Sequence, residues 1–143
     1  MHHDSLSGPC ACTLLRKAAR AVGRFYDEAL AGAGMTTAQF AILRHLSRTD
    51  ALPLSRLAEQ LVLDRTSLYR AVAPLIDLGW VAAAPGHGKE KRASLTAAGR
   101  AAMRAAEPGW EEAQRRLLGG MDPAAWARIE AQLRILTESA LAN

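Results

Sequence analysis

Polar and basic side chains gather in two nearby stretches of the sequence. The segment after Asp64 is mostly polar, a glycine-rich segment near residue 88 adds further cations, and the candidate contacts are Arg65, Thr66, Ser67, Tyr69, Arg70, Lys89, Lys91 and Arg92. Arginine can bind a phosphate or hold a guanine edge with two hydrogen bonds, and a hydroxyl can hydrogen-bond to either. These residue types therefore predict a surface that binds double-stranded DNA.

The positive charge of the chain is concentrated in the same region. Residues 54–104 hold eight basic and four acidic residues, a net charge of +4, whereas the rest of the chain holds ten of each. Phosphate contacts release counterions and dominate affinity for nucleic acids, so a local excess of this kind suits a nucleic-acid partner. A solvated basic face would show the same excess, and only the elements that carry the charges can separate these two interpretations.

Hydrophobic spacing and helix caps place the first stretch on two short helices. Apolar residues with helical spacing predict a helix over 54–61, and Asp64 is a suitable N-cap for a second helix over roughly 65–78. Two short helices joined by a tight turn, the second one polar and basic, are typical of a helix-turn-helix. The groove-facing part would be the first half of the second helix.

The second stretch is predicted to be the tip of a β-hairpin. Residues 80–84 and 90–96 are short strand candidates, and the Gly-rich segment 85–89 separates them. The order is a long helix, three short helices, the hairpin and two long helices. We therefore expect a mainly α fold with a small β-hairpin wing, that is, a winged helix-turn-helix with long N- and C-terminal dimerisation helices.

The long terminal helices predict a homodimer. Their apolar faces have little to cover them within one helix-turn-helix lobe, and a second copy would cover them. A two-fold dimer would bind the two half-sites of a palindromic operator. On this basis we expect a dimerisation helix in 1–34, a DNA-binding lobe in 35–98 and C-terminal dimerisation helices in 99–143.

The chain also resembles a MarR-family transcriptional regulator over nearly its full length. The resemblance rests on Thr37-Ala38-Gln39-Phe40 with Leu43, Leu57-Ala58, Asp64-Arg65-Thr66-Ser67-Leu68, Leu78-Gly79-Trp80 and Leu95-Thr96-Ala97-Ala98-Gly99. It implies a homodimer with interlocked first and last helices and a winged helix-turn-helix in each lobe. It further implies a repressor of MarR type whose DNA affinity is lowered by a small anionic or aromatic ligand or by an oxidant.

One departure from the family pattern lies in the wing. Family wings usually carry an aspartate two residues before an arginine, and the acid orients that arginine for the minor groove. The matching residues of this chain are Glu90, Lys91 and Arg92, and the stretch from there to Thr96 is shorter than usual. Arg92 is the predicted wing contact, and whether Glu90 orients it is left open.

Two cysteines near the start of the first helix suggest a further chemistry. A helix N-terminus lowers the pKa of a thiol, so Cys10 and Cys12 are candidates for redox sensing through a disulfide across the dimer. They could also bind a soft metal with His2 or His3, although residues on opposite sides of a helix rarely hold one ion. Inert packing as small apolar residues is the third interpretation.

A ligand cleft is the other candidate site. Arg16 and Arg20 lie four residues apart on one face of the first helix, and His45 lies on the second helix. These side chains could receive an anionic ligand between the dimer core and the DNA-binding lobe. A solvated face or a row of intersubunit ion pairs explains the same arginines.

Other classes of function find little support in the sequence. There is no Gly-x-Ser-x-Gly, no Gly-rich phosphate loop and no His-Glu-x-x-His, so neither an enzyme nor a cofactor is expected. No apolar run is long enough for a membrane span and the N-terminus does not read as a signal peptide, so a cytoplasmic protein is expected. A helical protein-binding adaptor remains as an alternative, but it would leave the basic helix unexplained.

Overall fold

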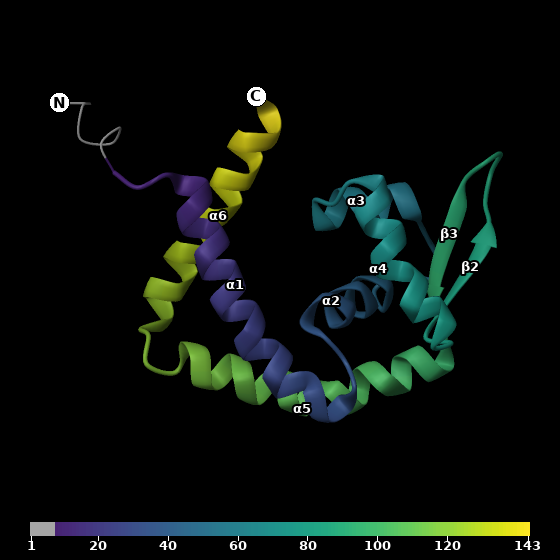
Figure 1. The fold of residues 1–143 in the computed structure, drawn as a ribbon, viewed down its shortest axis with the longest axis horizontal. Helices are drawn as coiled ribbons and strands as arrows, with labels where there is room; N and C mark the ends of the chain where they lie inside the picture. The colour runs from purple at the N-terminus through teal and green to yellow at the C-terminus, as the bar shows by residue number, and fades with distance from the viewer. Residues whose placement is uncertain (1–7) are drawn as a thin grey trace. The chain divides into compact units, whose positions relative to one another are not determined.

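A computed structural model describes residues 8–143 of the chain (Figure 1). The chain divides into two compact units, Met1–Trp110 and Glu111–Asn143. In chain order the elements are α1 (Ala11–Leu30), η2 (Ala31–Ala33), α2 (Thr37–Leu46), β1 (Leu52–Pro53), α3 (Leu54–Leu61), α4 (Arg65–Asp77), β2 (Val81–Pro85), β3 (Lys91–Leu95), α5 (Ala97–Leu118) and α6 (Pro123–Ala142). The expected fold class, a mainly α winged helix-turn-helix with long terminal helices, is confirmed.

Local hydrogen bonds fix the starts of α2 and α4. The Thr36 hydroxyl accepts a bond from the Gln39 N–H at 3.2 Å, and the Gln39 side chain accepts one from the Thr36 N–H at 3.0 Å. At the start of α4, the Asp64 carboxylate accepts a bond from the Ser67 N–H at 2.7 Å. These bonds satisfy amide groups that the helix itself leaves without partners. The N-cap predicted at Asp64 is confirmed.

The helix-turn-helix is built on a core of leucine and valine. The apolar residues of α4 that point inward are Leu68, Val72 and Leu75, which recur at helical spacing and are at most 1% exposed. They pack in one cluster with buried leucines of α2 and α3. Because that face of α4 is buried, its polar face must be turned to solvent. Pro74 lies within α4, and the helix continues past it to Asp77.

The wing is a three-stranded antiparallel sheet in the order β1-β3-β2. In the β2–β3 hairpin Ala83 lies opposite Ala93, and Gly79 makes the preceding turn at φ +77°. The hairpin was expected from the sequence, and β1 was not. Strand β1 pairs Leu52 with Ala93, and it thereby fixes the start of α3 against the wing.

Thr96 connects the wing to α5. Its hydroxyl donates to the Gly79 carbonyl at 2.6 Å and accepts from the Gly99 N–H at 2.9 Å. A side chain at Gly99 would collide with the carbonyl of Trp80, so this close approach requires glycine. The part of α5 in the first unit contributes Met103 and Ala106 to the core.

The second unit holds the end of α5 and all of α6. Gly119 and Gly120 separate the two helices, and Asp122 caps α6 ahead of Pro123. Helix α6 has no buried residue, and several of its leucine and isoleucine side chains are exposed in the single chain. The proposed division into 1–34, 35–98 and 99–143 concerns function and stays a prediction.

Val62 in the turn between α3 and α4 has an unusual backbone. It ends α3 at φ +54° and ψ +45°, while the next amide, that of Leu63, bonds to the Ala58 carbonyl at 2.9 Å. Glycine normally occupies this left-handed position, and a β-branched residue is strained there. Val62 is 55% exposed, so little packing compensates for the strain.

Replacing Val62 with glycine is expected to stabilise the protein. Relief of a left-handed strain of about 1–2 kcal/mol should outweigh the backbone entropy of glycine, for a net gain of up to about 1 kcal/mol. Chemical denaturation monitored by circular dichroism measures the change. Val62→Ala keeps a Cβ atom and should gain less than Val62→Gly. A lower free energy of unfolding for the glycine variant would contradict this account.

Candidate nucleic-acid interface

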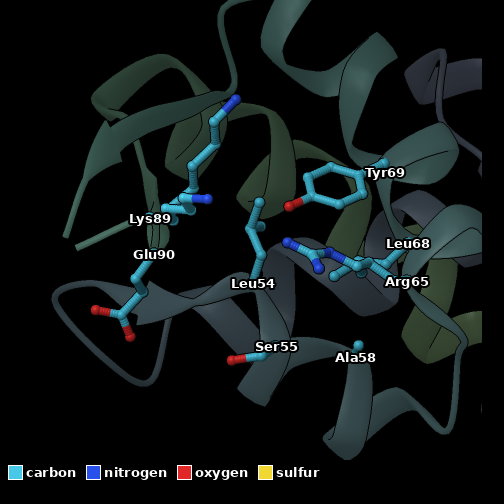
Figure 2. A pocket seen from close by; sticks show the side chains of 9 residues that line it. Leu54, Ser55, Ala58, Arg65, Leu68, Tyr69, Lys89 and Glu90 are labelled. Atoms are coloured by element: carbon cyan, nitrogen blue, oxygen red, sulfur yellow. The ribbon is translucent and has the colours of Figure 1, made fainter. Parts of the chain in front are cut away.

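A groove separates the helix-turn-helix from the tip of the wing (Figure 2). Its volume is about 510 Å³, and residues from α3, α4 and the hairpin tip surround it. The lining residues are Leu54, Ser55, Ala58, Arg65, Leu68, Tyr69, Lys89, Glu90 and Lys91. The structure thus brings together cations from two stretches that lie more than 20 residues apart in the sequence.

Arg65 and Tyr69 form the helical side of the groove. They lie one turn apart on α4, and the guanidinium carbon of Arg65 lies 5.7 Å from the centre of the Tyr69 ring. In Figure 2 both polar ends reach into the groove. Neither side chain pairs with an acid among residues 8–143. Arg65 therefore keeps its hydrogen-bond donors for an outside partner.

The other predicted DNA contacts on α4 are Thr66, Ser67 and Arg70, and one of them, Ser67, already has a hydrogen-bond partner. Thr66 and Arg70 are exposed, and neither lines the groove. Ser67 is half-buried and donates its hydroxyl hydrogen to Asp64 at 3.0 Å. The Ser67 hydroxyl is thus already used in the cap, whereas the sequence predicted it as a DNA contact. The Asp64 pKa is lowered, mainly by the hydrogen bonds from Ser67.

The wing places Lys89 and Lys91 on the groove, and Arg92 beside Glu90. Lys89 and Lys91 are exposed, whereas Arg92 is half-buried and does not line the groove. The Nε of Arg92 lies 3.4 Å from a carboxylate oxygen of Glu90. The contact between Glu90 and Arg92, which the sequence could not decide, is therefore present. The Glu90 pKa is held below its ordinary value, first by the His87 N–H and then by the charge of Arg92.

Helix α3 also contributes to the groove, which was not expected from the sequence. Ser55 lies exposed at its rim, and Leu54 and Ala58 are buried beneath it. The helical pattern assigned Leu54 and Ala58 to the inner face of α3 and so left Ser55 outside. The helical pattern thus indicated that Ser55 is exposed, but without knowledge of β1 nothing in the sequence placed this end of α3 near the wing.

The cysteines are both exposed free thiols. Cys10 immediately precedes α1, and its pKa is lowered by hydrogen bonds from the backbone and side chain of Thr13. The single chain does not bury Cys10 or Cys12, as inert packing would require. His2 and His3, the suggested metal-binding helpers, lie outside the described residues. Within residues 8–143 no group of three potential ligands could hold a metal ion.

The candidate ligand residues do not meet in the single chain. Arg16 and Arg20 are exposed on α1, whereas His45 is half-buried, with its Nδ1 2.8 Å from the Ala41 carbonyl. His45 lines two hollows, of about 450 Å³ and 170 Å³, and Arg48 lines both as well. Neither hollow includes Arg16 or Arg20.

The smaller hollow contains a stack of cationic and aromatic groups. The guanidinium carbon of Arg44 lies 4.4 Å from the ring centre of Trp110 and 5.6 Å from that of Phe40. All three side chains line the hollow. A guanidinium held over an indole gains stabilisation when it is shielded from water. This stack was not expected from the sequence.

Comparisons with known proteins agree with this geometry. The family model of the MarR family matches residues 33–90. The M. tuberculosis transcriptional regulator MosR in complex with DNA is 34% identical, with a TM-score of 0.86, and the match covers 94% of this chain and 98% of MosR. A second MosR structure has 35% identity and a TM-score of 0.81, and the match covers 94% of this chain and 97% of that one.

A MarR family transcriptional regulator from Streptomyces coelicolor is also similar. It has 29% identity and a TM-score of 0.78, and the match covers 91% of this chain and 92% of that one. A comparison with curated protein sequences gives no significant match. No helix in residues 8–143 has the length and hydropathy needed to cross a membrane. These similar structures are those of transcriptional regulators rather than enzymes, and the chain belongs to the MarR family of winged helix-turn-helix, DNA-binding transcriptional regulators.

Proposed function

We propose that this chain is a homodimeric repressor that binds a palindromic double-stranded operator. The observation that carries the proposal is the groove that Arg65 of α4 lines together with Lys89 and Lys91 of the wing. A recognition helix and a wing that present cations together suit a major groove and its neighbouring phosphates. The complex of the similar MosR with DNA supports this use of the fold.

Each element has a distinct role in the proposed complex. The exposed face of α4 enters the major groove, where Arg65 and Arg70 contact base edges or phosphates and the hydroxyls of Thr66 and Tyr69 assist. Lys89 and Lys91 bind phosphates. Arg92, with Glu90 beside it, is proposed for the minor groove next to the wing.

The dimer is proposed to form through the terminal helices. Leu14 on α1 and Leu133 and Leu136 on α6 are 56%, 38% and 47% exposed in the single chain. Side chains of this size are stabilised by about 1.5–3 kcal/mol each when fully buried, so a second copy that covers them is favourable. In this proposal segments 1–34 and 99–143 dimerise, and 35–98 binds DNA.

DNA binding tests the proposal directly. Purified protein is titrated into a labelled palindromic fragment from upstream of its own gene, and fluorescence anisotropy is recorded at several salt concentrations. The expected result is binding whose logarithmic affinity falls linearly with the logarithm of the salt concentration. A folded dimer that binds no such fragment even at low salt would overturn the proposal.

A small anionic or aromatic ligand is proposed to release the DNA. The hollow that contains Arg44, His45 and Arg48 supports such a ligand, because two guanidinium groups and an imidazole surround an aromatic wall there. Arg16 and Arg20 would join this site only if the partner subunit supplied them. Salicylate is a suitable probe, and quenching of tryptophan fluorescence on titration would report its binding near Trp110.

Thiol sensing is the second candidate signal, and the exposure of both cysteines favours it. The lowered pKa of Cys10 increases its thiolate fraction, and the thiolate is the form that attacks a peroxide. Attack of that thiolate on hydrogen peroxide, with uptake of a proton, gives a sulfenic acid and one water. A second thiol then displaces a second water and forms a disulfide.

Cys10→Ser and Cys12→Ser are each expected to abolish release of DNA by peroxide. The physical reason is that a disulfide needs two sulfur atoms, and serine offers none. Fluorescence anisotropy of the preformed complex measures release, and a non-reducing gel separates an intrachain disulfide from one across the dimer. Release by peroxide that persists in both variants would rule out the thiols as the sensor.

A further inference from the structure

The groove contains one acid among its cations. Glu90 lines it together with Arg65, Lys89 and Lys91, although a carboxylate on a DNA-binding surface repels phosphates. In Figure 2 its carboxylate is directed away from the Lys89, Arg65 and Tyr69 side chains. A group that opposes the proposed function of its surface calls for a structural explanation.

The explanation lies in the hairpin tip, residues 86–90, where Glu90 makes three hydrogen bonds. Its carbonyl accepts from the Gly86 N–H at 2.8 Å, and its own N–H donates to the His87 carbonyl at 3.1 Å. Its carboxylate accepts from the His87 N–H at 3.1 Å. The tip is thus folded around a single residue, and Lys89 and Lys91 are its immediate neighbours in the chain.

Gly86 leaves the space that this carboxylate occupies. A Cβ atom at Gly86 would lie 2.5 Å from an Oε atom of Glu90 and 3.2 Å from the Cγ of Arg92. Gly86 has no positive φ, so an alanine is compatible with the backbone there and only the carboxylate and its neighbour obstruct it. An alanine at position 86 would therefore displace the Glu90 carboxylate without straining the turn.

We propose that Glu90 is the positioning residue of the wing tip: its carboxylate closes the turn at His87, and this sets Lys89 and Lys91 at the groove. The same carboxylate oxygen also lies 3.4 Å from the Nε of Arg92, whereas the proposed role acts through the backbone of the tip. The inference rests on the proposed DNA binding, because the lysines matter only if DNA is the partner. The closure of the tip can be observed without DNA.

Nuclear magnetic resonance of the DNA-free protein tests the closure. The His87 amide signal should shift as the pH is lowered through the titration of Glu90, with a midpoint below the usual range for glutamate because the bonds favour the carboxylate. In Glu90→Gln the titration should be absent. A His87 amide signal that does not follow Glu90 would overturn the proposed closure, whatever the protein binds.

The DNA affinity of Glu90→Ala tests whether the lysines depend on Glu90, because a positioning role and simple repulsion predict changes of opposite sign. Glu90→Ala removes a negative charge and would tighten binding if the acid were only a repulsive neighbour. The proposal predicts binding that is weaker by about 3- to 10-fold and a shallower salt dependence, because the lysines lose their positions. Tighter binding by Glu90→Ala would overturn the positioning role.

Gly86→Ala is the variant that changes no charge. It should weaken binding to a similar extent by displacing the carboxylate, and the double variant with Glu90→Ala should be no weaker than Glu90→Ala alone. Gly32→Ala is the matched control, because a methyl group there meets open space. Additive losses in the double variant, or parental affinity in Gly86→Ala, would contradict the proposal. A parent protein that binds no DNA would instead overturn the proposed function and leave the magnetic resonance result standing.

Discussion

Arg65→Ala is expected to weaken operator binding by about 1–3 kcal/mol, or roughly 5- to 150-fold, and to relax discrimination at one base pair of each half-site. The guanidinium has no acidic partner among residues 8–143, and its position beside the Tyr69 ring directs it into the groove. A side chain that is already oriented loses less entropy when it binds two acceptors of a guanine. Fluorescence anisotropy with the operator and with single-base variants measures both effects.

Two control variants separate reading of a base from simple loss of charge. Arg56→Ala removes the same charge from an exposed side chain that lies 3.8 Å from Glu59 and outside the groove, so it should change affinity little. Lys89→Ala should weaken binding equally for all sequences and reduce the salt slope by about 1. If Arg65→Ala behaved like Lys89→Ala, Arg65 would be a phosphate contact and not a reader of sequence.

The helices of this fold could be located from the sequence because their ends are fixed by short-range bonds. Thr36 with Gln39 and Asp64 with Ser67 each act over three residues, a separation that can be read without any knowledge of the fold. The inner face of α4 was equally predictable from the spacing of its leucine and valine residues. The exposed position of Arg65 follows from that spacing alone.

The features that could not be predicted depend on contacts between distant parts of the chain. Strand β1 has two residues, too few to show an alternating pattern, and it exists only because β3 lies beside it. Without it, Ser55 could not be placed on the groove. The left-handed turn at Val62 was also invisible, because the residue type that normally marks such a turn is glycine.

The contacts of Glu90 in the wing could likewise be predicted only in part. The sequence placed Glu90 two residues before Arg92, and this was enough to raise the question of their contact. It could not show that the same carboxylate also accepts the His87 N–H, because that bond depends on the path of the tip and on the space left by Gly86. For Arg16, Arg20 and His45, the single chain gives no common site, and the predicted cleft still depends on a partner subunit.

Leu133→Glu combined with Leu136→Glu is expected to convert the dimer into monomers. With Ile129 these residues form one face of α6, since they are spaced four and three residues apart, and all three are 38–47% exposed in the single chain. Full burial of an exposed leucine contributes about 1.5–3 kcal/mol, and because Leu133 and Leu136 are 38% and 47% exposed, the dimer can add only about 0.6–1.4 kcal/mol for each of them. The two-fold axis repeats each leucine, so loss of the four contributions, about 2.5–5.5 kcal/mol, should raise the dimer dissociation constant by about two to four orders of magnitude. Analytical ultracentrifugation measures that constant.

Operator affinity should fall with the dimer, because a monomer can bind only one half-site of a palindrome at a time. The loss should be seen with the full operator and be much smaller with an isolated half-site, since α4 and the wing are unchanged in the variant. Gln132→Glu supplies the matched control: it adds a carboxylate to the same helix next to, but outside, the apolar face. If the double variant stayed dimeric and bound the operator like the parent, α6 would not form the interface, and the exposed leucines would need a different partner.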